Sequence, residues 1–477
     1  MQYTPQQELI LAEVTDLVKA QNSVLIEARA GAGKTFILTQ LAPFLPLGGH
    51  CLAFNKAIAE ELDTKLPGSC LAKTFHALGF SLLRERLQTV DMKMNKLYTL
   101  AKTKLKVQNT KPYTELVSAM KIAGMGLRDL PSPTLKNIDH LIDTRNIEVP
   151  ENITREEFIT QTIKLFKASL KQINVIDFDD MLYLPLYLAD KFGWSFDKFK
   201  FLMIDEAQDV SPLRLEMIKR LTDTVIAVGD PYQSIYGFAG AANGALNEIE
   251  TCYQTERYQL PHSFRCPSNI TQEASELIYP DSILSLPENL GGVVTRQKFN
   301  PTWYPTSESQ TVLCRMNAPL FVTALRMLRD GAAFNFNSDF PRQLISFQKR
   351  FKATTCKELQ VRVTAWFEEE SERLAGRKGP LSLAKEKHDT LMYLATQCED
   401  PKTITLTLEK LMTPNPGHPT LSTIHKAKGL EWPEVYLIRP DLLPAPFAST
   451  PEELEQERNL EYVAMTRASQ KFTYLDK

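Results

Sequence analysis

The amino-acid sequence predicts an α/β fold of two units, each with a parallel sheet and each carrying a mainly helical insertion. Short apolar runs at residues 24–26, 51–54, 70–72, 201–204 and 225–228 are typical of buried parallel strands. Segments with helical periodicity alternate with these runs, which favours a doubly wound sheet. A second set of runs follows at residues 312–314, 421–423, 435–438 and 472–475, and it indicates the second unit.

The first strand leads into a glycine loop and then into a helical segment, which is the pattern of a phosphate-binding loop. Gly31 and Gly33 allow the backbone to approach phosphates and to turn N–H groups towards them. Lys34 is placed to reach the β- and γ-phosphates, and the Thr35 hydroxyl is placed to bind Mg²⁺. An ordinary glycine turn is the alternative, but the contiguous Gly-Lys-Thr after a strand favours nucleotide binding. The predicted nucleotide-binding residues of this loop are Ala28, Gly31, Ala32, Gly33, Lys34 and Thr35.

Composition limits the class of protein without identifying a partner. The 477 residues include 55 Lys and Arg against 57 Asp and Glu, so any basic surface must be local. The seven cysteines form no C-x-x-C pair, which argues against a zinc ribbon or an iron–sulfur cluster and suits a reducing compartment. We find no signal peptide and no apolar run of membrane-spanning length. These observations predict a soluble cytoplasmic protein (nuclear if the source is eukaryotic) with no membrane partner.

The first insertion has a basic composition. Residues 84–129 contain ten Lys and Arg and four Asp and Glu, with few features of strands. A solvated helix surface and a contact with a phosphate backbone explain this composition equally well.

Polar residues follow two of the predicted core strands. Asp205 and Glu206 end the strand at residues 201–204, where one carboxylate can hold Mg²⁺ and the other can act as the base towards water. Gln233 follows the strand at residues 225–228 and is placed to sense the γ-phosphate. Tyr236 and Phe238 come next, and they are either core aromatics or a stacking platform for bases.

In their order along the chain, these residues resemble the superfamily-one DNA helicases of the UvrD, Rep and PcrA type, from Tyr3 to Leu475. The resemblance implies that Gln7, in Thr-Pro-Gln-Gln, reads adenine. It identifies residues 53–56 and 74–79 as early DNA-contact motifs, residues 205–209 as the Mg²⁺ and base motif, and residues 229–241 as the motif linking ATP to DNA. The implied DNA-binding residues are Phe54, Asn55, Thr74, His76, Tyr236, Phe238 and His425.

The second unit contains three further motifs of this family. Residues 260–265 resemble the motif in which an aromatic, here Phe264, stacks on adenine and an arginine, here Arg265, contacts the γ-phosphate. Residues 421–432 resemble the fifth motif, with Glu431 implied at the ribose. Residues 457–468 resemble the sixth, which makes Arg467 a second arginine finger. Fingers supplied by a different unit from Lys34 complete the site when the two units close on ATP.

The resemblance implies a domain plan of two recombinase-like motor domains. The expected parts are motor domain 1A (residues 1–82 and 176–260), insertion 1B (83–175), motor domain 2A (261–320 and 417–477) and a reduced insertion 2B (321–416). The Pro- and Gly-rich residues 413–419 mark the end of the second insertion. We therefore expect an ATP- and Mg²⁺-dependent helicase that moves 3′ to 5′ on single-stranded DNA and separates duplex at junctions, in replication, repair or recombination.

Two alternatives remain beside this interpretation. One is a translocase that strips proteins from DNA with little unwinding, and the other is an ATP-gated DNA-binding scaffold. The chain departs from the family at Phe238, where Trp is common, and at Phe264, where Tyr is common. Ten residues follow Arg467, so we expect the family's duplex-separating hairpin to be missing or displaced, and translocation to be better supported than strand separation.

Overall fold

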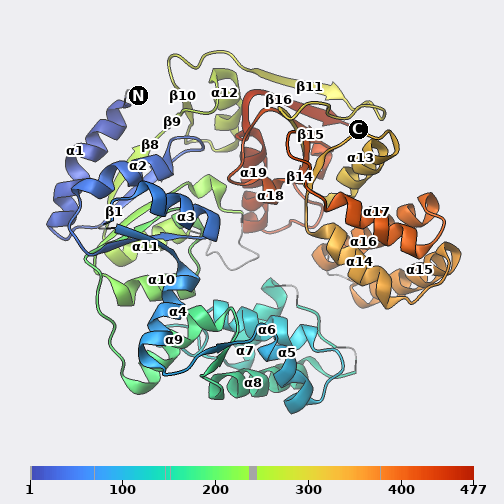
Figure 1. The fold of residues 1–477 in the computed structure, drawn as a ribbon, viewed down its shortest axis with the longest axis horizontal. Coiled ribbons are helices and arrows are strands. Elements are labelled where there is room, and N and C mark those ends of the chain that lie inside the picture. The colour runs from blue at the N-terminus through green and yellow to red at the C-terminus, as the bar shows by residue number, and fades with distance from the viewer. Residues whose placement is uncertain (1–2, 69, 146, 151, 236–243, 376–377) are drawn as a thin grey trace. The chain divides into compact units, whose positions relative to one another are not determined.

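The structure is a computed structural model and describes residues 3–68, 70–145, 147–150, 152–235, 244–375 and 378–477. The contacts of the chain divide it into two compact units (Figure 1). Unit 1 comprises Met1–Arg29 and Gly33–Leu260, and unit 2 comprises Ala30–Ala32 and Pro261–Lys477. The finer division into four parts stays a prediction. Across the described residues, no helix is both long and apolar enough to cross a membrane.

Unit 1 is built on a six-stranded sheet whose strands are all parallel. The order across the sheet is β3 (Cys70–Thr74), β2 (Gly49–Ala53), β6 (Leu202–Ile204), β7 (Val225–Gly229), β1 (Val24–Ala28) and β8 (Glu256–Leu260). All five residues of β1 and of β7 are buried, as expected for central strands of a parallel sheet. Helix α1 (Pro5–Lys19) precedes the first strand, and the helices that connect the strands are α2 (Lys34–Leu41), α3 (Lys56–Lys65), α10 (Pro212–Leu221) and α11 (Ala245–Tyr253).

Capping residues in the sequence fix where several helices begin. Thr4 accepts a hydrogen bond from the Gln7 backbone N–H, Gln7 accepts one from the Thr4 backbone N–H, and Pro5 occupies the first turn of α1. Asn55 caps α3 in the same way by accepting from the Ile58 N–H. These caps satisfy backbone donors that the first turn of a helix otherwise leaves unpaired.

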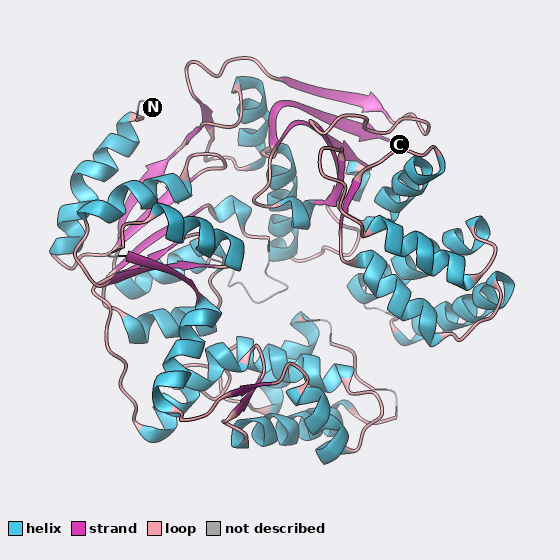
Figure 2. Ribbon diagram, in the orientation of Figure 1, coloured by secondary structure: helices cyan, strands magenta, loops and turns pink. Residues whose placement is uncertain are grey.

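A mainly helical region interrupts the first sheet between β3 and β6, and a short parallel pair of strands lies among its helices (Figure 2). Helices α4 and α9 pack against each other, and the apolar core of the sheet continues into the region without a break, from Leu25 to Phe158 and Leu165. The elements are α4 (Phe75–Arg86), β4 (Asp91–Met92), α5 (Lys96–Leu100), α6 (Lys111–Ile122), α7 (Leu135–Thr144), α8 (Arg155–Lys171), β5 (Val175–Ile176) and α9 (Asp180–Phe192).

Two of the ten basic residues counted in this region lie in its interior. Lys96 pairs with Asp180 at 2.6 Å, and Lys121 pairs with Asp177 at 2.9 Å and with Asp180 at 2.7 Å. We call these four side chains the interior ion network. It joins α5 and α6 to the start of α9, so two of the lysines cannot meet a phosphate backbone. Lys102, Lys104 and Lys106 are exposed, and for them both interpretations stay open.

Unit 2 has a second six-stranded parallel sheet, which confirms the predicted fold class. Its order is β11 (Val293–Lys298), β16 (Ala468–Asp476), β15 (Trp432–Ile438), β12 (Gln310–Cys314), β14 (Thr420–Thr423) and β13 (Asn335–Asn337). The sequence analysis did not identify the two edge strands, β11 and β13. Both are short of the apolar residues that marked the central strands, because edge strands of this sheet are partly exposed.

The helical insertion of unit 2 forms one apolar core with the sheet around Phe321, Leu344 and Leu391. Most of its helices follow one another between β13 and β14 (Figure 1). The remaining elements of the unit are β9 (His262–Ser263), α12 (Ser268–Leu277), β10 (Leu284–Ser285), α13 (Asn317–Arg329), α14 (Phe340–Arg350), α15 (Cys356–Arg373), α16 (Lys378–Gln397), α17 (Pro401–Leu411), α18 (Ile424–Ala427) and α19 (Pro451–Met465).

Candidate nucleotide site and nucleic-acid interface

The order of the strands in unit 1 gathers the predicted nucleotide residues at one edge of the sheet. Strands β6, β7 and β1 are consecutive neighbours and parallel, so their carboxyl ends meet there. Asp205 and Glu206 follow β6, Asp230 follows β7, and the glycine loop follows β1. Ligands of open α/β sheets bind at this edge.

The loop has the backbone that a phosphate-binding role requires. Gly33 has a φ of 82° and immediately precedes α2, so Lys34 and Thr35 are the first residues of that helix. Gly31 has a φ of 73°, and a Cβ atom there would lie 2.6 Å from Ser263 Oγ. Both positions therefore require glycine, and the N–H groups at the start of α2 are available to an anion.

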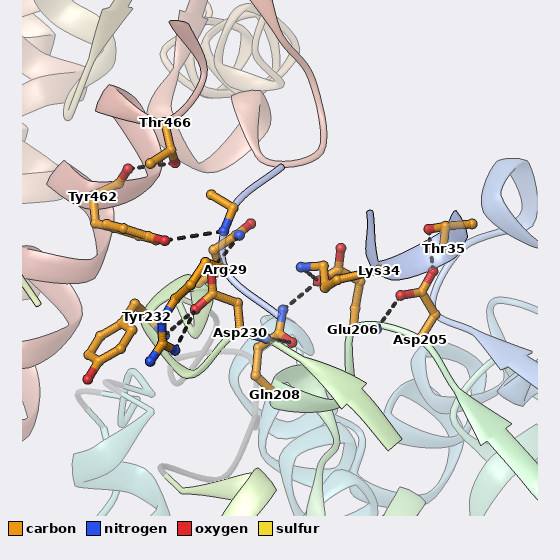
Figure 3. A network of polar contacts seen from close by, with 12 residues as sticks. Arg29, Lys34, Thr35, Asp205, Glu206, Gln208, Asp230, Tyr232, Tyr462 and Thr466 are labelled. Atoms are coloured by element: carbon orange, nitrogen blue, oxygen red, sulfur yellow. Dashed lines mark hydrogen bonds and ion pairs between the residues drawn. The ribbon is translucent and has the colours of Figure 1, made fainter. Parts of the chain in front are cut away.

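Two side-chain pairs bring the predicted chemical groups together (Figure 3). Lys34 Nζ lies 2.8 Å from Glu206 Oε2, and the Thr35 hydroxyl donates to Asp205 Oδ2 at 2.8 Å. The Lys34 and Glu206 side chains keep 11% and 21% exposure, so both can still be reached from solvent. The structure thus places in contact four residues that are up to 172 positions apart in the sequence.

The charges in this cluster are unbalanced, and the pKa values reflect it. Burial, and then the charge of Glu206, raise the pKa of Asp205 to about 6 against the opposing charge of Lys34. Burial alone would lower the pKa of Lys34, but Glu206, Asp230 and Asp205 outweigh it and hold that pKa above its usual value. A divalent cation at Asp205 would favour the ionised carboxylate.

The residues present fit Mg²⁺, which needs few protein ligands when phosphates and water complete its shell. A hydroxyl and a carboxylate oxygen, from Thr35 and Asp205, stand side by side as hard oxygen ligands. Among the described residues, no group of three or more His, Cys, Asp or Glu side chains could hold a metal without such a partner.

Gln208 is a member of the site that the sequence analysis did not identify. Its amide nitrogen donates to Glu206 Oε2 at 2.6 Å, and its amide oxygen accepts from the Asp230 backbone N–H at 3.0 Å. Asp230 in turn accepts from the Gln233 amide at 2.8 Å. A chain of hydrogen bonds therefore runs from the partly exposed Glu206 to the buried Gln233. The only sign of Gln208 in the sequence is its place within the motif at residues 205–209.

Arg29 is a second residue that the sequence analysis did not select. Its guanidinium lies 3.9 Å from Asp230 and 4.9 Å from the centre of the Tyr232 ring.

Gln7, predicted to read adenine, is buried in α1, and its amide nitrogen has no hydrogen-bond partner among the described residues. This nitrogen lies 3.6 Å from the position of a Cβ atom on Gly33, beside the loop.

In unit 2, the predicted arginine fingers are engaged by groups of their own unit. Arg265 pairs with Glu431 through Nε and donates to the Thr466 carbonyl at 3.1 Å. Arg467 is 1% exposed and donates to the carbonyls of Val463 and Leu430. A phosphate would have to take these donors from their present acceptors.

Two other unit 2 residues contact the loop segment Ala30–Ala32, which belongs to this unit. The Phe264 N–H donates to the Gly31 carbonyl at 2.9 Å, and the Ala30 N–H donates to the Tyr462 hydroxyl at 3.2 Å.

Burial, with help from Arg315 and Lys428, lowers the pKa of His425 to about 3, so this histidine is neutral at physiological pH.

Four of the predicted DNA-binding residues of unit 1 lie at the carboxyl ends of β2 and β3, the strands beyond β6 in the sheet. Asn55 caps α3, and the Thr74 hydroxyl caps α4 by accepting from the Ala77 N–H. Phe54 meets Phe75 edge to face at 5.5 Å between ring centres. Tyr236 and Phe238, also predicted to bind DNA, lie outside the described residues.

His76 is stacked on an aromatic residue that the sequence analysis missed. Its ring centre lies 3.8 Å from that of Phe178, and Phe178 is 47% exposed. Burial, followed by the charge of Arg214, lowers the pKa of His76 to about 4. The pair is therefore a neutral aromatic surface that is open to solvent on one side.

Comparison with known proteins identifies the family. A family model described as the UvrD/REP helicase N-terminal domain matches residues 12–254, which is just over half of the chain. The chain belongs to the UvrD/Rep helicase family. A second model of the family, the UvrD-like helicase C-terminal domain, matches residues 384–475.

Individual relatives of the UvrD/Rep family are distant. The chain is 28% identical to the ATP-dependent DNA helicase Rep of Escherichia coli over 280 residues, which cover 53% of this chain and 41% of Rep. It is 24% identical to F-box DNA helicase protein 1 of Schizosaccharomyces pombe over 520 residues, covering 94% of this chain and 55% of that protein. The chain spans about half the length of the curated relatives that it matches.

Solved structures add little to this assignment. A structure of arterivirus nonstructural protein 10, a helicase, with DNA covers 98% of this chain and 63% of its own chain, at 14% identity and a TM-score of 0.38. The family assignment rests on the family models.

Proposed function

We propose that this protein is an ATP- and Mg²⁺-dependent DNA translocase and helicase. It moves 3′ to 5′ on single-stranded DNA and separates duplex at junctions, in replication, repair or recombination. The observation that supports this best is the pairing of Lys34 with Glu206 and of Thr35 with Asp205 at the carboxyl edge of a parallel sheet. Membership of the UvrD/Rep family agrees with it.

The chemistry proposed for this site uses both pairs. When ATP enters, Lys34 leaves Glu206 and binds the phosphates. It then stabilises the charge that develops on the γ-phosphate during the reaction. Glu206 is then free to accept a proton from the attacking water, while Gln208 holds its carboxylate in place. Bound through Asp205 and Thr35, Mg²⁺ would supply charge neutralisation on the phosphate oxygens.

Fewer contacts support the proposed recognition of the nucleotide and the proposed link between ATP hydrolysis and movement. The unpartnered amide nitrogen of Gln7 is a donor suited to an acceptor on the adenine ring. Gln233 senses the γ-phosphate through its bond to Asp230. We assign adenine stacking to Phe264, the ribose to Glu431, and the two arginine fingers to Arg265 and Arg467, which act when the motor domains close.

Single-stranded DNA is proposed to lie on the aromatic residues beyond β2 and β3. Base–aromatic stacking contributes about 1–3 kcal/mol per base and tolerates any sequence. The exposed face of Phe178, backed by the neutral His76, offers a surface of this kind, and Phe54 lies at the neighbouring strand end. Asn55, Thr74 and His425 are assigned to the same partner on the resemblance alone.

The test combines ATPase and unwinding assays on the same preparation. ATP turnover is measured with and without single-stranded DNA, and unwinding is measured on duplexes with either a 3′ or a 5′ tail. We expect DNA-stimulated turnover and unwinding of the 3′-tailed duplex. The Lys34→Ala variant is the matched control and should lose both.

Three results would change the proposal. Unwinding confined to the 5′-tailed duplex would reverse the polarity. Turnover with translocation and protein displacement, but without strand separation, would reduce the activity to that of a stripping translocase. ATP binding without turnover would leave a DNA-binding scaffold.

A further inference from the structure

Arg214, in the first turn of α10, brings a positive charge to the aromatic residues at this edge of unit 1. Its guanidinium carbon lies 4.5 Å from the centre of the Phe54 ring and 5.5 Å from that of Phe75. The charge is near enough to His76 to lower the pKa of that imidazole. Strands β3, β2 and β6 are consecutive in the sheet, and α10 follows β6, which explains why these residues meet.

The hydrogen bonds of Arg214 leave most of its donors unused. Nη1 donates to the Asp209 carbonyl at 3.2 Å, and the buried Nε has no partner. Within the described part of the chain, no carboxylate forms an ion pair with this guanidinium. A guanidinium carries five N–H donors in a fork that suits an anion with several oxygens.

Arg220, two turns further along α10, shows what a structural arginine looks like in the same surroundings. It lies 2.8 Å from Asp190 and 2.8 Å from Glu216, so two carboxylates neutralise it. Arg214 has aromatic faces where Arg220 has carboxylates. A cation of the first kind stays available to an external anion, whereas one of the second kind is already satisfied.

Arg214 is charged at neutral pH in spite of its surroundings. Burial lowers the pKa of its guanidinium to about 10, with Asp209 opposing the shift, and that value is still well above 7. The side chain is half-buried, and its charge acts on His76, which stacks on the exposed Phe178. The cation thus lies close to the stacking surface.

From this arrangement we infer that Arg214 is a phosphate contact for single-stranded DNA, held by Phe54 and Asp209 so that its free donors meet the backbone while the neighbouring rings meet the bases. The inference deepens the proposed function and rests on it. The alternative is that Arg214 only packs on Phe54 and makes no contact with DNA.

The measurement is the salt dependence of DNA binding. Affinity for a fluorescent oligothymidylate is measured without nucleotide between 50 and 200 mM salt, for the full chain and its Arg214→Gln variant. Each phosphate contact on a single strand contributes a slope of about −0.7 in log affinity against log salt concentration. We expect the variant to bind more weakly at 50 mM, with a slope about 0.7 less steep. Its deficit in affinity should therefore shrink about threefold by 200 mM.

Two further variants separate charge from packing. Arg214→Lys keeps the charge and should restore most of the slope, although it loses the planar fork. Lys219→Gln removes a partly exposed cation from the same helix that already faces Glu216 and should leave affinity and slope unchanged. Circular dichroism of each variant checks that the fold is retained.

An Arg214→Gln variant that binds more weakly but keeps the slope of the unaltered protein would overturn the inference, because packing alone would then explain the loss. If Arg214→Gln fails to fold, Arg214→Met takes its place, because its apolar side chain can still pack on Phe54 without a charge: a slope about 0.7 less steep supports the contact, and an unchanged slope refutes it. If the unaltered protein shows neither DNA binding nor DNA-stimulated ATP turnover, it is the proposed function that fails.

Discussion

Unit 1 contains two clusters of lysine and carboxylate groups, one buried and one partly open to solvent, that are built on opposite principles. In the interior ion network, two lysines face two aspartates, and although burial raises the pKa of Asp180, Lys121 and Lys96 outweigh it and hold that pKa below its usual value. In the nucleotide cluster, one lysine faces Asp205 and Glu206, and the pKa of Asp205 is raised to about 6.

The difference indicates what each cluster is for. A balanced network satisfies its own charges and needs no ligand, so its contribution is to hold α5, α6 and α9 together. An unbalanced one retains an excess of negative charge that a proton or an added cation can neutralise. Perturbed carboxylates are thus informative about function when their neighbours fail to compensate them.

Glu206→Gln should produce the largest effect and should act on catalysis alone. The loss of a general base lowers kcat by about 10²–10⁴-fold. Stability should change by about 1 kcal/mol or less, because Asp205 and Asp230 still face Lys34. DNA-stimulated ATP turnover and a urea unfolding curve of the same sample check both parts. Turnover near the normal rate would remove Glu206 from the role of base.

Lys121→Met should have the converse effect, on stability first. Removal of this lysine leaves Asp177 buried without an ion-pair partner and leaves Asp180 with Lys96 alone, at a cost of about 3–5 kcal/mol. The urea midpoint should fall accordingly. The exposed Lys102→Met in the same region is the matched control, with an expected change within about 0.5 kcal/mol. Equal midpoints for the two variants would show that the interior network is not structural.

Gln208→Met should give a smaller loss that is specific to the nucleotide cluster. The variant keeps the volume but removes the donor to Glu206 and the acceptor for the Asp230 N–H. We expect kcat to fall by about 10–100-fold through misplacement of the base, with KM for ATP little changed. A rise in KM at constant kcat would assign Gln208 to ATP binding instead.

His76→Phe should have the smallest effect at neutral pH, because its effect on stability is confined to acid. The folded pKa of about 4 lies below the unfolded value of about 6.5, so between these limits the unfolded chain binds a proton that the folded chain does not. Stability of the unaltered protein therefore falls as the pH falls from 6.5 to 4, by up to about 1.4 kcal/mol per unit.

The variant keeps an aromatic ring against Phe178 and removes this titration. Its stability should therefore depend less on pH between 4 and 6.5, and at pH 7 it should equal that of the unaltered protein. Urea midpoints measured at intervals from pH 4 to pH 7 test this. Parallel curves would mean that His76 is protonated as easily in the folded chain as in the unfolded one.

The sequence predicted those parts of the site that lie next to each other along the chain. The Gly-Lys-Thr run indicated the loop, and the apolar run before Asp205 indicated a strand end. It did not predict Gln208 or Arg214, since their roles depend on partners that only the folding of the sheet brings near.

Lys96 and Lys121 were counted as part of a possible basic surface for the same reason, because composition cannot tell a buried lysine from an exposed one. The edge strands β11 and β13 were missed because their partly exposed residues lack a continuous apolar run.

The strand order of unit 1 also has a consequence for how the protein is made on the ribosome. Both neighbours of β1, namely β7 and β8, are encoded far downstream, and the hydrogen bond from the Val225 N–H to the Ser23 hydroxyl spans 202 positions. At a synthesis rate of about 5–20 residues per second, the strand that precedes the glycine loop waits about 10–40 s for its partners. During that time its apolar residues and both of its edges are open to other chains. We therefore expect the nascent protein to depend on chaperones most strongly before β7 emerges.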